Sequence, residues 1–311
     1  MLTKKLPVLK KGDKIALIST ARKISEAEIT PAIQVLNSWG LEVVLGKNLF
    51  AIEHQFAGTV EQRTFDLQVA LDNPEIKAIF CARGGYGTVQ LIDKIDFSNF
   101  IENPKWIIGY SDVTMLHNHI HQNFGIPTLH ATMPINFPTN TTESLHSLKD
   151  ALFGKELTYS CAYHPLNQLG RAEGVLVGGN LSIIYSLTGT SSQLNTKNKI
   201  LFLEDLDEYL YHIDRMMQNL KRAGMLTNLK GLLVGGMSDM NDNAIPYGKT
   251  AQEIIKDAVA EYNYPVAFDF PAGHLADNRA LVFGGKISFQ VTEKETTIIS
   301  FSPSYCNHCS I

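Results

Sequence analysis

The chain has few cysteines, no long apolar stretch and no excess of charge of either sign. Its 311 residues include four cysteines, which are too few for a disulfide framework in a chain of this length. No segment approaches the roughly 18 consecutive apolar residues of a membrane-spanning helix. The 27 basic and 31 acidic residues form no run of one sign, so the sequence lacks the footprint of proteins that bind nucleic acid or anionic membranes. These absences favour a protein that acts on small soluble molecules.

The two ends of the chain carry no clear targeting or metal-binding signal. Residues 1–10 contain too few apolar residues for a signal peptide, which predicts a cytoplasmic protein with reduced thiols. Near the other end, Cys306 and Cys309 have the spacing of a metal or redox pair, but no second pair of ligands accompanies them. We interpret them as part of an ordinary terminal tail.

The first half of the sequence alternates between strand and helix patterns. Short apolar runs rich in β-branched residues occur at 14–19, 41–45, 77–82, 106–109 and 127–131. Helical patterns lie between them at 26–39, 59–73, 87–93 and 112–124. This alternation predicts an α/β fold whose N-terminal domain, residues 1–150, is a doubly wound parallel sheet covered by helices on both faces. Ligands of such sheets bind beyond the carboxyl ends of the strands.

The second half predicts a different domain. Residues 134–170 are rich in Asn, Thr and Ser and predict a connection with one short helix, whose part 151–170 is the linker between domains. Strand patterns follow at 173–177, 199–203, 229–234, 266–270, 286–290 and 296–301, with helices at 211–223 and 250–262. Since the last two strands have no helix between them, we expect residues 171–311 to form a compact α/β domain with a partly closed, swivelling-barrel-like sheet.

Two glycine-rich loops resemble nucleotide-binding motifs but lack a required residue. In residues 85–90, Gln90 stands where the dinucleotide fingerprint needs a third small residue. Residues 248–250 resemble the end of a P-loop, but Asn243 stands where its first glycine belongs. We therefore predict no nucleotide cofactor.

Three histidines on one predicted helix resemble a metal site. His117 and His121 share a helix face, but Asn118 replaces the glutamate of the His-Glu-x-x-His motif, and no third ligand is evident. We interpret the three histidines, His119 included, as an exposed or partly packed helix face and predict no bound metal.

Ser111 lies where a predicted strand gives way to a predicted helix. The apolar run from Trp106 stops at Gly109, and the helical pattern begins just after the serine. Nucleophilic serines are commonly placed on such turns, with the N–H groups of the following helix pointing at the reacting carbonyl. The usual motif is Gly-x-Ser-x-Gly, however, and Val113 takes the last position. From this turn alone, a helix-capping serine is an equal alternative.

Two further residues complete a possible catalytic set. Glu204 follows the apolar strand 200–203, and His274 follows the apolar run 266–270 on a tight turn. The acidic cluster 204–208 would also suit Mg²⁺ or simple solvation, and a lone histidine is usually structural. Serine hydrolysis needs a nucleophile, a base and an acid that orients the base, and Ser111, His274 and Glu204 supply these three groups at strand ends.

The sequence closely resembles the L,D-carboxypeptidase family of serine peptidases, which includes muramoyltetrapeptide carboxypeptidases and microcin C immunity proteins. The resemblance extends along nearly the whole chain. Its motifs are Lys11-Gly-Asp-Lys-Ile15, Phe56-Ala-Gly-Thr59, Arg63, Asp66-Leu-Gln68, Ala82-Arg-Gly-Gly-Tyr-Gly87, Gly109-Tyr-Ser-Asp-Val-Thr114, Gly178-Gly-Asn-Leu181, Leu187-Thr-Gly-Thr190, Phe202-Leu-Glu-Asp205, Ile213-Asp-Arg215 and Gly273-His274. One departure is His130-Ala-Thr-Met133, where the family commonly has His-Gly-Pro-Met, and this departure puts contacts with substrate in question.

The resemblance implies a two-domain enzyme with a catalytic triad at the domain interface. Ser111 would be the nucleophile, His274 the base and Glu204 the orienting acid, with no cofactor. The backbone N–H of Asp112 and one from the Gly84-Gly85 turn would form the oxyanion hole. The implied reaction releases terminal D-alanine from cytoplasmic muropeptide tetrapeptides during cell-wall recycling, and the implied assembly is a homodimer.

Two other functions remain open from the sequence. One is an immunity-type hydrolase of peptidyl or aminoacyl adenylate antibiotics, for which Tyr209 or Tyr211 would supply an aromatic platform. The other is a non-catalytic two-domain protein that binds a sugar or peptide at the same strand ends. The residues that bind the substrate cannot be chosen from the sequence.

Overall fold

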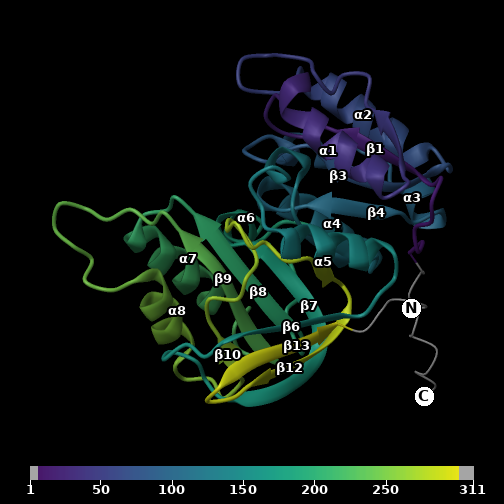
Figure 1. Ribbon diagram of the computed structural model, residues 1–311. Coiled ribbons are helices and arrows are strands. Elements are labelled where there is room, and N and C mark those ends of the chain that lie inside the picture. The colour runs from purple at the N-terminus through teal and green to yellow at the C-terminus, as the bar shows by residue number, and fades with distance from the viewer. Residues whose placement is uncertain (1–5, 301–311) are drawn as a thin grey trace.

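The computed structural model describes residues 6–300, which form two β-sheets with helices packed around them (Figure 1). The first sheet contains, in spatial order, β2 (Glu42–Leu45), β1 (Lys14–Ile18), β3 (Ile76–Cys81), β4 (Trp106–Gly109), β5 (Thr128–His130) and β11 (Leu281–Phe283). The chain runs from β1 outward to β2, then returns across β1 to β3 and continues to β5. This reversal in the direction of strand order is typical of a doubly wound sheet, as predicted.

The first sheet is mixed, not purely parallel. Its first five strands are parallel, but β11 pairs antiparallel with β5, so that Leu281 lies opposite His130. The five strands from residues 1–150 are parallel, as predicted, and the antiparallel strand is an addition from the second half of the chain that was not predicted. The short apolar run Leu281–Phe283 was not identified as a strand, and its pairing depends on a contact with β5 that the sequence does not display.

Five α-helices connect or follow these strands. They are α1 (Glu26–Ser38), α2 (Val60–Asp72), α3 (Ser98–Glu102), α4 (Thr114–Phe124) and α5 (Thr142–Leu152). A capping box begins α2, because the Thr59 side chain accepts from the N–H of Gln62, and the Gln62 side chain accepts from Thr59 N–H. The α-helix expected at 87–93 was wrong: this segment forms two 3₁₀ turns, Thr88–Gln90 and Ile92–Lys94.

The second sheet has seven strands in the order β10 (Val266–Ala267), β9 (Gly231–Ser238), β8 (Ile200–Leu206), β7 (Gly170–Asn180), β12 (Lys286–Val291), β13 (Glu295–Ser300) and β6 (Leu157–Ala162). The first four are parallel and the others antiparallel. Beyond β6, Gln168 forms an isolated antiparallel bridge with Val266 of β10, which brings the two edges of the curved sheet together. The sheet is thus partly closed, as predicted, and the described strands form no complete barrel.

The segment 151–170, expected as a linker, contains strand β6. Its residues alternate between buried and exposed, and β6 pairs with β13 along its full length. The prediction of one short helix in 134–170 is confirmed by α5. The prediction that this region contains no strand was wrong. Thr, Ser and Tyr are frequent both in loops and in edge strands, so composition alone did not separate the two. The domain bounds 1–150 and 171–311 stay a prediction.

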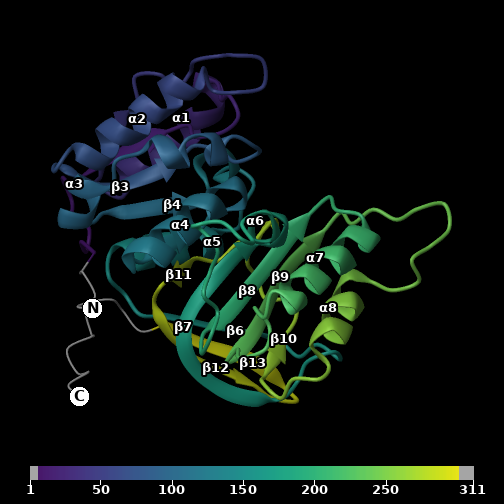
Figure 2. The same cartoon turned by 180° about the vertical axis from the view of Figure 1, so that it is seen from behind.

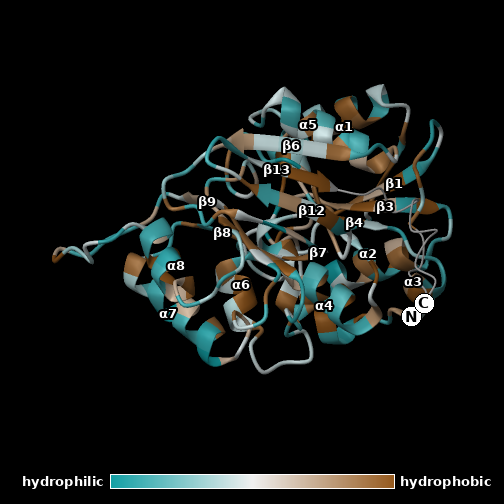
Figure 3. Ribbon diagram, turned by 90° about the horizontal axis from the view of Figure 1, so that it is seen from below, coloured by the Kyte–Doolittle hydropathy of each residue, from teal (hydrophilic) through white to brown (hydrophobic). Residues whose placement is uncertain are grey.

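The helices of the second half cover one part of the second sheet. They are α6 (Leu181–Ser186), α7 (Leu210–Arg222) and α8 (Ala251–Val259), and the last two lie beside β8 and β9 (Figure 2). Their buried side chains, among them Met216, Leu220 and Ile255, join one apolar cluster with those strands. Both helices carry hydrophilic as well as hydrophobic residues (Figure 3), as expected of amphipathic helices with one buried face.

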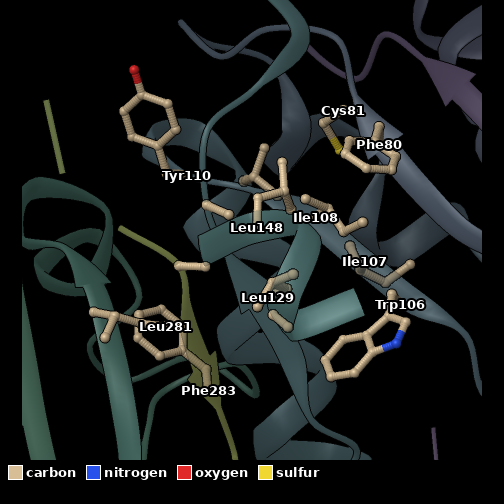
Figure 4. Packing of buried hydrophobic residues seen from close by; sticks show 14 of the residues in the cluster. Phe80, Cys81, Trp106, Ile107, Ile108, Tyr110, Leu129, Leu148, Leu281 and Phe283 are labelled. Atoms are coloured by element: carbon tan, nitrogen blue, oxygen red, sulfur yellow. The ribbon is translucent and has the colours of Figure 1, made fainter. Parts of the chain in front are cut away.

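A larger apolar cluster spans both sheets. Side chains of β4 and β11, such as Ile108 and Phe283, lie in one buried group with Leu129 of β5 (Figure 4). Phe202 and Leu233 of the second sheet belong to the same cluster. The two halves of the chain therefore share a core, which holds the ends of β4 and β8 in a defined relation. None of the helices within residues 6–300 has the length and apolar character needed to cross a bilayer.

Candidate active site

Ser111 occupies a strained turn between β4 and α4. Its φ is +61°, a left-handed conformation that costs a non-glycine residue about 1–3 kcal/mol. A single 3₁₀ turn, Ser111–Val113, leads directly into α4. Gly109 is required here, because a Cβ at this position would lie 2.8 Å from a methyl carbon of Val113. The valine that breaks the usual elbow motif thus packs against the first glycine of the turn.

The Gly84-Gly85 turn after β3 lies against the Ser111 side chain. A Cβ placed on Gly84 would be 3.2 Å from Ser111 Oγ, and Gly85 has a φ of +116° that favours glycine. The Asp112 side chain is buried and accepts the N–H of Thr88, further along the same loop, at 2.9 Å. Asp112 therefore has only its backbone N–H to offer beside Ser111.

Glu204 and His274 form a buried pair from the second half of the chain. Nδ1 of His274 donates to Oε2 of Glu204 at 2.7 Å, and the His274 backbone N–H donates to the same oxygen at 3.2 Å. The Glu204 side chain is fully buried. Gly273 permits this approach, because a Cβ there would lie 2.7 Å from both Cβ and Oε2 of Glu204. The other ring nitrogen of His274, Nε2, bonds to none of the described residues.

The environment of this pair favours a charged imidazole. Burial lowers the pKa of His274, but the Glu204 carboxylate outweighs it through its charge and hydrogen bond, so that the pKa lies above its ordinary value. Oε1 of Glu204 is also buried and has no hydrogen-bond partner among the described residues. The negative charge of Glu204 is consequently compensated mainly by His274, which suits an acid that stabilises a protonated base.

The two halves of the site meet through Tyr110. This residue precedes Ser111, and its ring lies edge-on to the His274 ring with centroids 4.8 Å apart. Tyr110 is buried, and its hydroxyl donates to Asn136 Oδ1 at 3.1 Å. The ring contact brings the turn that carries Ser111 next to the His274–Glu204 pair. Ser111 Oγ makes no hydrogen bond to any described residue, His274 included. Catalytic hydrogen bonds often shorten only when substrate binds.

An open cavity of about 350 Å³ lies beside His274. The residues that line it come from both halves of the chain: Tyr110, Asn136, Thr139, Asn140, Leu206, His274, Leu275 and Ala276. The side-chain amide of Asn140 donates to the carbonyl oxygens of Leu275 and Ala276, so the cavity wall is braced across the two halves. A peptide terminus or another small polar group would fit this volume.

Two family models match the chain, and they decide its classification. The model described as the LD-carboxypeptidase N-terminal domain matches residues 15–131, and the model described as the C-terminal domain matches residues 173–289. The chain belongs to the LD-carboxypeptidase family. It is therefore a peptidase of the carboxypeptidase type. The resemblance drawn from the sequence motifs is confirmed.

Named relatives support the same classification of this LD-carboxypeptidase. A probable murein peptide carboxypeptidase of Bacillus subtilis is 36% identical over 308 residues, which cover 96% of this chain and 95% of the relative. A murein tetrapeptide carboxypeptidase of Pseudomonas aeruginosa is 31% identical over 284 residues, covering 87% and 91%. Both alignments extend over most of this chain and most of the relative.

Solved structures resemble this LD-carboxypeptidase along most of its length. The muramoyltetrapeptide carboxypeptidase from Oxalobacter formigenes has a TM-score of 0.85 and 25% identity, and the match covers 93% of this chain and 99% of that one. MccF in complex with glutamyl sulfamoyl guanosine also has a TM-score of 0.85, with 21% identity and coverage of 94% and 98%. The second likeness shows the shared fold alone.

The other motifs of this LD-carboxypeptidase have structural explanations. His117 is buried, not exposed, and its Nε2 contacts the Gly109 carbonyl at 2.9 Å; burial lowers its pKa to about 4. His121 Nε2 lies 2.9 Å from Lys199 Nζ. No cluster of metal-binding side chains occurs in the part of the chain that the structure describes. Cys306 and Cys309 lie outside the described residues.

The departure from the family motif after β5 lies away from the cavity. Ala131 and Thr132 are fully buried, and the Thr132 hydroxyl donates to the Asn278 carbonyl at 3.3 Å. Since neither side chain is accessible, neither contacts a ligand in the cavity. The expectation that the backbone of this segment differs from the family at the edge of the substrate site stays a prediction.

Sequence reasoning missed several residues that organise the site. Tyr110, Thr114 and Asn180 lie within the quoted motifs, but their individual roles were not identified. Asp205 was grouped with solvated or Mg²⁺-binding acids, yet it is buried. Burial, together with the charge of Glu204, raises its pKa to about 7. The signal available in the sequence was the pair Glu204-Asp205 after an apolar strand, since two adjacent residues of a strand face opposite sides.

Proposed function

We propose that this LD-carboxypeptidase is a serine peptidase that releases the terminal D-alanine from muropeptide tetrapeptides, with Ser111, His274 and Glu204 as its triad. The observation that carries the proposal is the 2.7 Å hydrogen bond from His274 to a fully buried carboxylate, next to a serine on a strained turn. The names of the relatives from Pseudomonas aeruginosa and Oxalobacter formigenes support the substrate class. We place the reaction in the cytoplasm, in recycling of cell-wall peptides.

In this mechanism Ser111 Oγ attacks the carbonyl carbon of the L,D-amide bond, and Nε2 of His274 accepts the hydroxyl proton. Glu204 stabilises the resulting imidazolium. The oxyanion accepts hydrogen bonds from the backbone N–H groups of Asp112 and of the Gly84-Gly85 turn. The C–N bond then breaks as His274 returns the proton to the leaving amine of D-alanine, and a water molecule, deprotonated by His274, releases the acyl group from Ser111.

The substrate assignment is tested with a stem tetrapeptide that ends in D-alanine on an L-configured diamino acid. We expect release of D-alanine, detected by mass spectrometry, and no cleavage of the matched peptide that ends in L-alanine. An aminoacyl sulfamoyl adenylate in a parallel reaction tests the immunity-type alternative. Cleavage of the adenylate alone would contradict the proposed substrate, and binding of the tetrapeptide without cleavage would favour a non-catalytic ligand-binding protein.

The pH dependence of the reaction follows from His274. The imidazole must be neutral to accept the serine proton, and its pKa is raised above the ordinary value of about 6.5. We therefore expect kcat/KM to fall as the pH decreases through an apparent pKa above 6.5, measured with the tetrapeptide between pH 5 and 9 as a rough working range. An acid limb at a lower pH would contradict the role of Glu204 as the partner that raises this pKa.

The homodimer expected from the resemblance remains part of this proposal. Light scattering compared with the chain mass of 34.5 kDa would test it directly. A mass of one chain at micromolar concentration would contradict the dimer and leave the proposed chemistry unaffected.

A further inference from the structure

A hydrogen bond joins the nucleophile helix to the second sheet. Thr114 Oγ1 accepts the backbone N–H of Asn180 at 3.0 Å, and both residues are buried. Thr114 is the first residue of α4 and follows Ser111 by three positions along one continuous helical segment. Asn180 is the last residue of β7, where it lies opposite Glu204 of β8. The contact therefore connects the element that carries the nucleophile with the strands that carry the acid.

The Asn180 side chain is held by Asp205. Its Nδ2 donates to Asp205 Oδ1 at 2.8 Å, and its Oδ1 accepts from Ser182 Oγ at 2.7 Å and from the N–H of Ile183 at 3.2 Å. Asp205 Oδ2 accepts the N–H of Ser182 at 2.9 Å. Every polar atom of the Asn180 and Asp205 side chains thus has a partner, which fixes both side chains in one orientation.

Asp205 is also the chain neighbour of Glu204, which binds the ring of His274. A continuous path consequently leads from His274 through Glu204, Asp205 and Asn180 to Thr114, and from there along the helical segment to Ser111. This path crosses from one half of the chain to the other. A shift of Thr114 relative to Asn180 would displace the nucleophile relative to its base.

Close packing restricts such a shift. A Cβ on Gly179 would lie 2.5 Å from Thr114 Oγ1 and 2.6 Å from its methyl carbon, and a Cβ on Gly178 would lie 1.9 Å from the Phe202 carbonyl oxygen. The end of β7 therefore fits between α4 and β8 only because two glycines occupy these positions. Their φ values of +132° and +140° also favour glycine.

We propose that Thr114, Asn180 and Asp205, here termed the inter-half bridge, are positioning residues that set the distance between Ser111 Oγ and the His274 ring. The inference rests on the proposed triad. It goes beyond that triad because no direct hydrogen bond between Ser111 and His274 holds the two groups together in the structure. Their relative position must come from the surrounding scaffold, and a misplacement of about 1 Å costs a reaction roughly 100-fold in rate.

The test compares Thr114→Val with Thr114→Ser. Valine keeps the shape of threonine but leaves the Asn180 N–H without its acceptor, whereas serine keeps the acceptor and loses only a methyl group. For Thr114→Val we expect kcat to fall about 10- to 100-fold with KM changed less than about threefold, because the nucleophile is displaced while the substrate pocket is retained. Thr114→Ser should retain kcat within about threefold of the wild type. The rate of Ser111 labelling by a fluorophosphonate should follow kcat.

Thr196→Val is the matched control for loss of a buried threonine hydrogen bond. Thr196 Oγ1 donates to the Met225 carbonyl at 2.6 Å in the second half, in a contact that links neither half to the other. We expect it to lower the melting temperature while kcat per folded molecule stays at the wild-type value. Asp205→Asn is a second probe of the bridge. Its amide has one acceptor oxygen where Asp205 has two, so either Asn180 Nδ2 or the Ser182 N–H loses its acceptor, and we expect the same selective loss of kcat.

The outcomes separate the bridge from the proposed chemistry. A folded Thr114→Val enzyme with wild-type kcat, or a Thr114→Ser enzyme that loses as much kcat as Thr114→Val, would overturn the bridge alone. If Thr114→Val does not fold, a folded Asp205→Asn enzyme with wild-type kcat overturns the bridge, and one with a selective kcat loss supports it. A wild type that neither cleaves the tetrapeptide nor takes up the label at Ser111 would overturn the proposed function, and the bridge with it.

Discussion

Replacing Ser111 by alanine is expected to lower kcat for D-alanine release by about 10⁴- to 10⁶-fold, with the fold retained. The hydroxyl is the proposed nucleophile, and no described residue hydrogen-bonds to it, so its removal breaks no contact that holds the turn together. Turnover is measured by D-alanine release. The circular dichroism spectrum and the melting temperature report on the fold.

Ser111→Gly is the control for backbone strain at this position. Serine and alanine are both strained at a φ of +61°, whereas glycine adopts this conformation without strain. The glycine variant should therefore be at least as stable as the alanine variant and equally inactive. Substantial turnover by either variant would remove Ser111 from the mechanism, whatever the stability measurements show.

Replacing Glu204 by glutamine is expected to lower kcat by about 10⁴-fold. The amide has nearly the same size, but it carries no charge to stabilise the imidazolium, and its N–H₂ group favours a His274 tautomer with the proton on Nε2. That tautomer cannot accept a proton from Ser111. The loss of the carboxylate also removes the main influence that raises the His274 pKa, so the acid limb of the remaining activity should move to lower pH.

A second carboxylate–histidine pair provides the control for this substitution. Glu208 Oε2 lies 2.6 Å from Nδ1 of His212 on the neighbouring helix α7, and both side chains are partly exposed. Glu208→Gln removes the same kind of contact without touching His274, so kcat should stay within about threefold of the wild type. An equal loss of kcat in the two variants would show that Glu204 acts through general electrostatics or stability and not through its hydrogen bond to His274.

Much of the fold could be predicted from local patterns. The strand β1 and the helix α2 follow from an apolar run and from a capping box with helical periodicity, because both signals reflect interactions between residues close in the chain. The strands β6 and β11 were missed for the opposite reason. β6 is an edge strand with polar residues, and β11 has three residues whose partner lies about 150 positions earlier in the sequence.

The residues of the candidate site also divide into those that local sequence patterns reveal and those that only the fold reveals. Ser111, Glu204 and His274 each follow a strong strand signal, so the sequence placed them at strand ends and the family motifs supplied a reason to combine them. The sequence could not identify the bridge, because Thr114, Asn180 and Asp205 are ordinary polar residues until their neighbours are known. Their roles depend on burial and on hydrogen bonds between segments that are distant in the chain.

The amino-acid sequence alone was sufficient for the class of fold, the family and the residues of the proposed triad, since these depend on periodicity, turn chemistry and motifs read along one chain. Only the folded molecule reveals that Glu204 is fully buried against His274 and that Ser111 adopts a left-handed conformation. It also shows that β7 enters between α4 and β8 through two glycines. These features arise where two sheets share a core, and their energies depend on distances that no local pattern encodes.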